Sequence, residues 1–256
     1  MGKQRFEAGR FFLKDTIRQQ IDFSQTGQAM HKPAPALQQE CDPALTRIAL
    51  SDGQDALNRL AIMPVSAAIA SRESVRNYSE ASLTLEELSA LLWAVQGVRR
   101  VAGPTTAQRT VPSAGARHSF ETYLAIDRVE TLEPGVYRYL PFEHELVLMR
   151  SDADVGSKAG EACLRQGCVT KAAVSFFWKT VPGRMEWRYD LAAHKAIAVD
   201  AGHVGQNLYL AAEAMGLGVC AIAAYYQDRC DALVGVDGVD EFTVYIAALG
   251  RKKKKE

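Results

Sequence analysis

Two arginines and a serine alternate in the first third of the chain, and their types suit anion binding. Arg72, Ser74 and Arg76 occupy every second position, so an extended backbone would direct all three side chains to one side. Guanidinium groups bind phosphate through paired, charge-assisted hydrogen bonds. The same alternation is typical of a solvated strand edge, and taken alone the stretch favours that explanation.

Two further stretches could contribute to the same site. In VPSAGARH a proline fixes a turn and small residues would let the backbone approach a flat ligand: Pro112, then Ser113, Ala114 and Gly115. A plain loop would have the same composition. Gly250-Arg251 closes the last predicted strand, where Arg251 could face solvent or add a third cation to the same anion.

Other candidate motifs carry less weight. Gly216-Leu217-Gly218 begins a match to the dinucleotide fingerprint G-x-G-x-x-A, but it follows a predicted helix and precedes a predicted strand, the reverse of the required order. We therefore expect these glycines to end the helix. His203 is expected to be structural, and His118 is equally consistent with a structural or a chemical role. The lysines at the end of the sequence are expected to form a solvated tail.

The bulk properties disfavour several classes of protein. The 256 residues are 48% apolar and 23% charged, which is the ordinary globular balance. Their net charge of zero gives no reason to expect nucleic acid or an anionic membrane as a partner. An apolar run long enough for a membrane span does not occur. The five cysteines include no C-x-x-C pair, which disfavours a metal site or a disulfide framework and favours free thiols in the cytoplasm.

The elements that must position these residues follow from periodicity. Residues 84–97 predict a helix, with Thr84 and Glu87 at capping-box spacing and Gly97 placed to end it. Residues 200–218 predict a second helix. Strands are predicted over 121–129, 172–181, 219–226 and 241–251, and a hairpin over 135–150. Helices and strands mix without regular alternation, which favours an α+β fold.

The first 70 residues differ from the rest. Residues 32–43 carry three prolines and predict an extended loop, and the stretch 52–69 predicts one short helix. We therefore expect residues 1–70 to be a largely irregular N-terminal extension. Residues 71–256 would then form one ligand-binding domain.

Taken together, these stretches resemble the nitroreductase family of flavoproteins, and more narrowly its SagB-type dehydrogenase-like branch. The resemblance runs from about Arg72 to Arg251 and is carried by RESVRNY, LTLEELSALLWAVQGV, RTVPSAGARH, LEPGVYRYLP, GHVGQNLYLAA and the final LGR. It implies a nitroreductase-like fold over residues 71–256, with a central, mainly antiparallel sheet flanked by helices. It also implies a homodimer with FMN bound at the interface.

The resemblance assigns roles to individual residues. The motif that holds the FMN phosphate and the polar edge of the cofactor is matched by Arg72, Ser74 and Arg76. The closing phosphate ligand is matched by Gly250-Arg251. The loop that lies near the flavin, usually supplied by the partner subunit, is matched by Pro112, Ser113, Ala114 and Gly115. The segment whose backbone N–H faces flavin N5 is matched by Ala223 and Ala224. The flavin carries the redox chemistry, which explains why no side-chain nucleophile stands out.

The implied activity is hydride transfer through flavin N5, from NADH or NADPH to a small nitro, quinone or enone acceptor. SagB-type enzymes that oxidise azolines carry a Lys-Tyr pair where this chain has Arg188-Tyr189. Tyr189 could still exchange a proton near the substrate, whereas Arg188 cannot act as a base at neutral pH. Two alternatives stay open: an azoline dehydrogenase that modifies a peptide, and a flavin-fold binding protein without catalysis.

Overall fold

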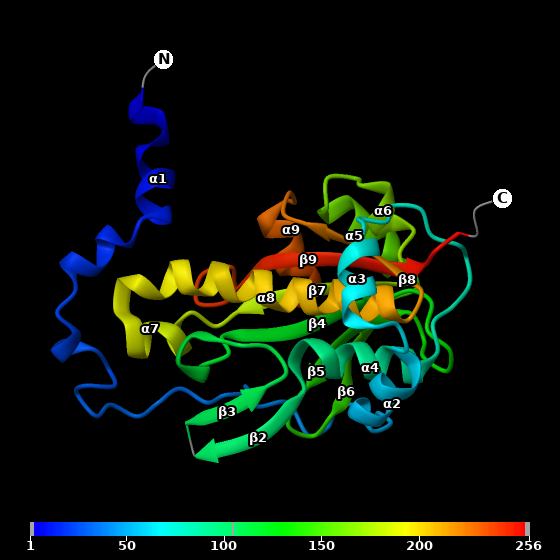
Figure 1. The fold of residues 1–256 in the computed structure, drawn as a ribbon, viewed down its shortest axis with the longest axis horizontal. Coiled ribbons are helices and arrows are strands. Elements are labelled where there is room, and N and C mark those ends of the chain that lie inside the picture. The colour runs from blue at the N-terminus through cyan, green and yellow to red at the C-terminus, as the bar shows by residue number, and fades with distance from the viewer. Residues whose placement is uncertain (1–2, 104, 254–256) are drawn as a thin grey trace.

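A seven-stranded antiparallel sheet forms the centre of the molecule (Figure 1). The computed structural model describes residues 3–103 and 105–253. The strand order is β1-β6-β5-β4-β7-β9-β8, and a separate hairpin joins β2 to β3. The strands are β1 (Arg47–Ala49), β2 (Val98–Gly103), β3 (Thr106–Arg109), β4 (Phe120–Ile126), β5 (Gly135–Leu140), β6 (Glu145–Ser151), β7 (Val174–Thr180), β8 (Leu217–Ile222) and β9 (Phe242–Arg251).

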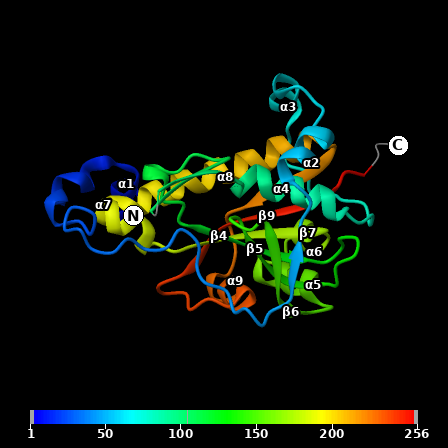
Figure 2. The same ribbon diagram turned by 90° about the horizontal axis from the view of Figure 1, so that it is seen from below.

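Helices cover both faces of this sheet (Figure 2). The α-helices are α1 (Glu7–Leu13), α2 (Gly53–Leu60), α3 (Val65–Ser71), α4 (Leu85–Gln96), α5 (Val155–Ala162), α6 (Gly167–Thr170), α7 (Gly183–Tyr189), α8 (Ala193–Ala214) and α9 (Gln227–Val234). Short 3-10 helices are η1 (Lys3–Phe6), η2 (Asp15–Gln20), η3 (Phe23–Gln25), η4 (Ala114–Ala116) and η5 (Asp190–Ala192). Within the described residues, no helix combines the length and the apolar character that a membrane crossing requires.

Two hydrophobic clusters fill the layers between the sheet and its helices. Along β4, Leu124 and Ile126 belong to the cluster that includes α4 and α8, whereas Tyr123 and Ala125 belong to the cluster that includes α5, α6 and α9. This alternation follows from the two-residue period of a strand. The strand predicted over 172–181 forms β7, an inner strand between β4 and β9, and helices on both faces of the sheet explain why it is apolar along most of its length.

The predicted α+β fold is confirmed, and the predicted strands all form. α4 carries the expected capping box: Glu87 N–H donates to Thr84 Oγ1 at 3.1 Å, and Thr84 N–H donates to Glu87 Oε2 at 2.8 Å. The hairpin predicted over 135–150 consists of β5 and β6, which are antiparallel neighbours. Local sequence signals therefore determine these elements well.

The helix predicted over 200–218 begins earlier than expected. α8 starts at Ala193, because its buried residues continue at helical spacing toward the N-terminus through Ile197. Gly216, with φ of 72°, follows the end of the helix as predicted for a left-handed stop. Gly218 does not end the helix, because it already lies in β8.

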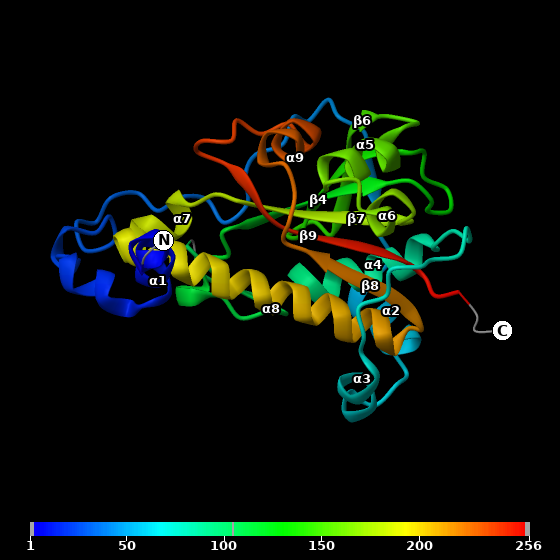
Figure 3. The same cartoon turned by 90° about the horizontal axis from the view of Figure 1, so that it is seen from above.

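Residues 1–70 contain more structure than a largely irregular extension. β1 pairs with β6 at the edge of the sheet, and two helices, α2 and α3, stand where one was predicted. Residues 32–43 contain neither helix nor strand, as predicted. Farther toward the N-terminus, η2 packs against η5 just before the start of α8, and α1 lies at the same end of the molecule, away from the C-terminus (Figure 3). β1 has only three residues, so its sequence carries too short a pattern to be predicted.

Candidate functional site

The stretch Arg72–Arg76 runs beside β8 at the edge of the sheet. Ser74 forms a parallel bridge to Val219, and Val75 N–H donates to the Val219 carbonyl oxygen at 2.8 Å. The Ser74 hydroxyl lies 2.9 Å from the hydroxyl of Tyr209 on α8. The stretch is therefore extended, as its alternation predicts, and both the backbone and a side chain hold it in place.

Tyr209 connects this stretch to the sheet. Its hydroxyl accepts the Ala221 N–H at 2.8 Å, and the Arg72 guanidinium carbon lies 5.2 Å from the centre of its ring. That separation is typical of a cation–π contact. The sequence alone did not single out Tyr209, because Ser74 and Tyr209 are 135 positions apart.

A hollow of about 640 Å³ opens in front of this stretch. It is lined by residues 73–77 together with Lys252 and Lys253. Arg76 is exposed and donates to the Ser74 carbonyl at 3.3 Å, and Lys252 Nζ lies 2.7 Å from Glu213 Oε2. The hollow thus combines three cationic side chains with the Ser74 hydroxyl and one carboxylate, that of Glu73, and Lys252 is the cation that already has a carboxylate partner. The expectation of a solvated lysine tail is wrong for Lys252, which bonds Glu213, whereas Lys253 is exposed as expected and the last two lysines lie outside the described residues.

Two glycines let the stretch lie close to the sheet. Gly218 and Gly250 pair across β8 and β9. A Cβ atom on Gly218 would come within 2.7 Å of Val75 Cγ1, and one on Gly250 within 2.8 Å of Tyr78 Cγ. Gly250 therefore makes room for Tyr78, which follows the stretch Arg72–Arg76. Its predicted role in cofactor binding stays a prediction.

Arg251 already has internal partners. Its Nε donates to the Ser82 carbonyl at 2.9 Å, and its Nη2 lies 2.8 Å from Glu87 Oε2. That carboxylate also accepts the Thr84 N–H in the capping box. Arg251 therefore ties the end of β9 to the start of α4, and its predicted role as a phosphate ligand stays a prediction.

The loop Pro112–Gly115 lies in another part of the molecule. Ala114 N–H donates to both carboxylate oxygens of Asp200 on α8, at 3.2 and 3.3 Å, and Asp200 is only 4% exposed. Ser113 Oγ accepts the His118 N–H at 2.9 Å. The predicted small-residue loop is thus held rigidly by a buried carboxylate that sequence reasoning did not single out.

Gly115 and Tyr189 lie in contact. Gly115 has φ of 59°, and a Cβ atom there would lie 2.5 Å from the Tyr189 hydroxyl and 2.8 Å from Arg188 Nε. Only glycine fits both this backbone conformation and this approach. The structure therefore brings the predicted catalytic residue Tyr189 to the predicted flavin loop.

Within one chain, the hollow and the loop are separate. Ser74 at the hollow contacts Tyr209 of α8, and Ala114 of the loop bonds Asp200 of the same helix. These two helix residues are nine positions apart, which corresponds to roughly 13 Å along the helix axis. Ala223 and Ala224 are exposed and follow β8, roughly 13 Å along the strand direction from the Ser74 bridge to Val219. Of the predicted site residues, Ser74 and Arg76 line the hollow, Tyr189 contacts the loop, and Ala223 and Ala224 lie apart from the hollow.

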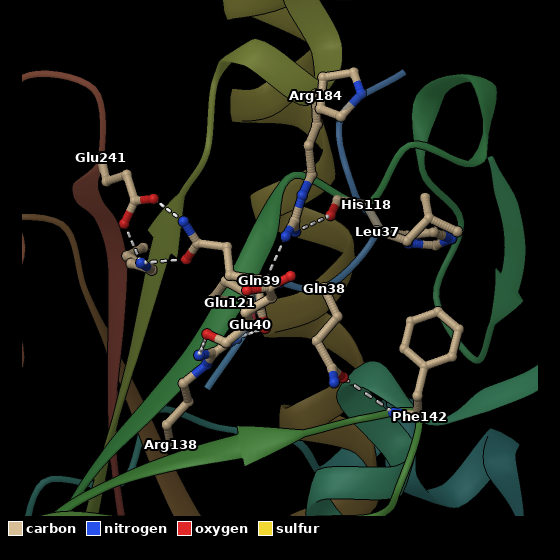
Figure 4. Close-up of polar contacts among 12 residues, drawn as sticks. Leu37, Gln38, Gln39, Glu40, His118, Glu121, Arg138, Phe142, Arg184 and Glu241 are labelled. Atoms are coloured by element: carbon tan, nitrogen blue, oxygen red, sulfur yellow. Dashed lines mark hydrogen bonds and ion pairs between the residues drawn. The ribbon is translucent and has the colours of Figure 1, made fainter. Parts of the chain in front are cut away.

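A buried ionic cluster joins Glu121 on β4 to Arg138 on β5 and Arg184 on α7 (Figure 4). Arg184 and Arg138 both bond the Glu121 carboxylate, Arg138 at 3.1 Å. Burial by itself would raise the pKa of Glu121, but the two guanidinium groups outweigh it and lower the pKa. All three side chains are almost fully buried, so no room is left for a ligand between them.

The segment 35–40 closes this cluster from the N-terminal side. Arginines donate to its backbone carbonyls: Arg117 to Pro35 at 2.9 Å, Arg109 to Leu37 at 2.9 Å, and Arg138 to Gln39 at 2.7 Å and Glu40 at 2.9 Å. In return Gln39 N–H donates to Glu121 at 3.0 Å. These contacts make the segment an integral part of the packed structure.

His118 is buried next to the loop. Its Nε2 lies 3.0 Å from the Ala107 carbonyl, and its backbone has φ of 47°. Burial, followed by the positive charge of Arg109, lowers the pKa of His118 to about 3. A neutral, buried imidazole with a backbone partner fits a structural role.

Comparison with known proteins identifies relatives of this chain. The family model described as the nitroreductase family matches residues 69–251. A Methanocaldococcus jannaschii protein named as a candidate nitroreductase is 33% identical over 181 residues, which cover 71% of this chain and 87% of that protein.

Solved structures agree. A candidate nitroreductase from Ralstonia eutropha is 27% identical with a TM-score of 0.67, covering 87% of this chain and 95% of that one. Another from Anabaena variabilis is 26% identical with a TM-score of 0.68 over 82% of this chain, which spans 42% of that longer chain.

Two more distant structures share the fold alone. The NADPH:FMN oxidoreductase of Vibrio harveyi is 17% identical with a TM-score of 0.52, covering 74% of this chain and 69% of that one. The Escherichia coli microcin synthetase complex contains a chain that is 17% identical with a TM-score of 0.60, covering 85% of this chain and 79% of that one. The match over residues 69–251 and the sheet and helices described above show that this chain belongs to the nitroreductase family.

Proposed function

We propose that this protein is an FMN-dependent oxidoreductase that uses a nicotinamide donor to reduce a small organic acceptor. The observation that carries the proposal is the hollow beside Ser74, where the cations Arg76, Lys252 and Lys253 outnumber the one acidic residue, Glu73, around a hydroxyl. The terminal phosphate of FMN is a dianion, and clustered cations with a hydroxyl donor suit it. The FMN oxidoreductase of Vibrio harveyi, which shares the fold, supports the choice of flavin.

Residues at the hollow would bind and orient the cofactor. Ser74, fixed by Tyr209, would donate to the phosphate, while Arg76 and the two lysines of the hollow, with Arg72 beside Tyr209, would neutralise it. Ala223 and Ala224 lie farther along the same edge and would offer backbone N–H groups to the ring system. When bound, FMN supplies hydride and electron transfer at N5.

The loop Pro112–Gly115 would come from a second copy of the chain. The resemblance to the family implies that the partner subunit supplies this loop, so a homodimer would place one loop over each cofactor. Tyr189, in contact with Gly115, would then hold a proton near the substrate. The buried Asp200 fixes the loop in position for this.

Reduction is favoured over azoline oxidation. Arg188 replaces the lysine of the azoline-oxidising branch, and a guanidinium stays protonated at neutral pH. The likeness to the microcin synthetase complex concerns the fold alone. The resemblance to the SagB-type branch is therefore no argument for azoline oxidation. A genome context with neither a cyclodehydratase nor a precursor peptide would remove the azoline alternative.

An absorbance spectrum followed by anaerobic titration tests the proposal. We expect the purified protein to be yellow, and its flavin band to bleach on addition of NADH or NADPH and to return with a nitro, quinone or enone acceptor. Protein that stays colourless after incubation with FMN contradicts the proposal. Protein that binds FMN but is reduced by neither nucleotide supports the alternative of a binding protein without catalysis.

A further inference from the structure

A second cavity, of about 420 Å³, lies beside the Pro112–Ala114 loop. α8 forms one of its walls, and η2 of the N-terminal segment brings Asp15 and Arg18 to its rim. η2 packs against η5, just before the start of α8. The match to the family model begins only at residue 69, so this rim belongs to a segment outside the family match.

The cavity combines apolar walls with charged side chains at its edge. Ala114, Ala196 and Val199 line the part next to the loop, together with Pro112 and Ala192. Its size is within the range of small-molecule sites. An apolar wall of this kind suits the ring of an aromatic acceptor. The charged side chains at the edge of the cavity then determine which ring substituent can be bound.

The edge carries two cations, Arg18 and Lys195, together with His203 and two carboxylates, Asp15 and Asp200, each of which already accepts a hydrogen bond. Arg18 donates its Nε to Asp15 at 2.9 Å, which leaves the two terminal nitrogens of its guanidinium. Lys195 faces the cavity and has no hydrogen bond or ion pair to any of the described residues. Asp200, by contrast, already accepts the Ala114 N–H on both oxygens. A carboxylate accepts hydrogen bonds from both kinds of cation.

We propose that this cavity binds the acceptor's carboxylate between Arg18 and Lys195, so that the N-terminal segment selects planar organic acceptors that carry an acidic group. The inference rests on the proposed function, because the acceptor must reach the loop that lies near the flavin. It goes beyond that function by naming the class of acceptor and two residues that determine specificity.

Binding and turnover of matched ligands test this. In the full-length, FMN-loaded protein, we expect benzoate to bind more tightly than benzamide by isothermal titration calorimetry. Lys195→Gln and Arg18→Gln should each weaken benzoate binding by about tenfold or more and leave benzamide within about twofold. kcat/KM for para-nitrobenzoate should fall by a similar factor, while that for para-nitrobenzamide stays nearly constant. Lys171→Gln, at an exposed lysine away from the cavity, is the matched control and should change neither ligand.

The outcomes separate this inference from the proposed function. FMN-loaded, active protein that binds benzoate no better than benzamide, or variants that affect both ligands equally, overturn the carboxylate site and leave the oxidoreductase standing. Colourless protein that binds benzoate through Lys195 upholds the site and overturns the oxidoreductase. Circular dichroism spectra that match wild type establish that the variants are folded.

Discussion

The arginines around Glu121 and the cations at the hollow beside Ser74 are the same kinds of residue in opposite surroundings. Arg138 and Arg184 are buried and bond one carboxylate, and Arg138 also donates to two backbone carbonyls. Arg76 is exposed and donates to a single carbonyl at 3.3 Å. A buried guanidinium must find its acceptors inside the protein. An exposed guanidinium group with unused donors is available for a ligand. Whether a cation is structural or binds a ligand therefore depends more on the acceptors near it than on its residue type.

Glu121→Gln should produce the largest effect. It removes the one carboxylate shared by Arg138 and Arg184 and leaves their charges buried, so we expect a loss of about 3–5 kcal/mol in the free energy of unfolding. Urea denaturation monitored by circular dichroism measures this. Glu145→Gln breaks the more exposed pair with Arg47, at 3.3 Å, and should cost less than about 1 kcal/mol. Equal losses in the two variants would erase the distinction between the two regions.

Arg76→Gln combined with Lys253→Gln should affect binding and spare stability. Each change removes a charge-assisted contact to the FMN phosphate, so we expect a combined loss of about 3 kcal/mol in FMN affinity, or roughly 100-fold. The free energy of unfolding of the apoprotein should stay within about 0.5 kcal/mol of wild type. Flavin fluorescence on titration gives the affinity. Unchanged FMN affinity would remove these two residues from the proposed site.

His118 should make stability depend on pH. Its pKa is about 3 in the folded protein, against an ordinary value near 6.5, so the unfolded chain binds the proton more readily. Stability from this group is fully present above about pH 6.5 and decreases as the pH falls toward 3, by about 2 kcal/mol at pH 5. Asparagine tolerates the positive φ of this residue and does not titrate, so His118→Asn should remove that part of the decrease. Denaturation curves at pH 7 and pH 5 test this, and identical pH dependence in both proteins would contradict it.

Thr84→Ala should produce the smallest effect. It removes the hydroxyl that accepts the Glu87 N–H and should cost about 1 kcal/mol in the free energy of unfolding. Glu87 keeps its contact with Arg251, so FMN affinity should not change. Ser79→Ala, outside the helix cap, serves as a control for the loss of a hydroxyl. A fall in FMN affinity in Thr84→Ala would show that the α4 start and the hollow are coupled.

The sequence predicted the elements that carry their own signals. The α4 helix, the β5–β6 hairpin and the apolar β7 strand need only local periodicity and capping chemistry. The start of α8 at Ala193 was missed because its buried face there consists of alanines, Ile197 and the polar Asp200, which together give a weak apolar signal. β1 was missed because three residues cannot show a period.

The residues of the candidate site likewise fall into those that local sequence reveals and those that depend on long-range contacts. Arg72, Ser74 and Arg76 could be singled out because their alternation is local, and the small residues of the Pro112–Gly115 loop could be recognised likewise. Tyr209, Asp200 and the two lysines at the hollow could not, because each depends on an approach between segments far apart in the chain. Arg251 shows the converse, since a recognisable position in the sequence does not reveal that Glu87 has bound its guanidinium.

The long-range contacts of the segment from Arg72 to Tyr78 have a consequence for biosynthesis. Ser74 depends on Tyr209, 135 positions later, and the Tyr78 hydroxyl donates to the Ala248 carbonyl, 170 positions later. Contacts of such high sequence separation form late, since the chain must first close a long loop. The hollow therefore cannot exist on a ribosome-bound fragment that lacks β9. A cofactor held there would therefore stabilise only a chain in which β9 has been made and has paired with β8.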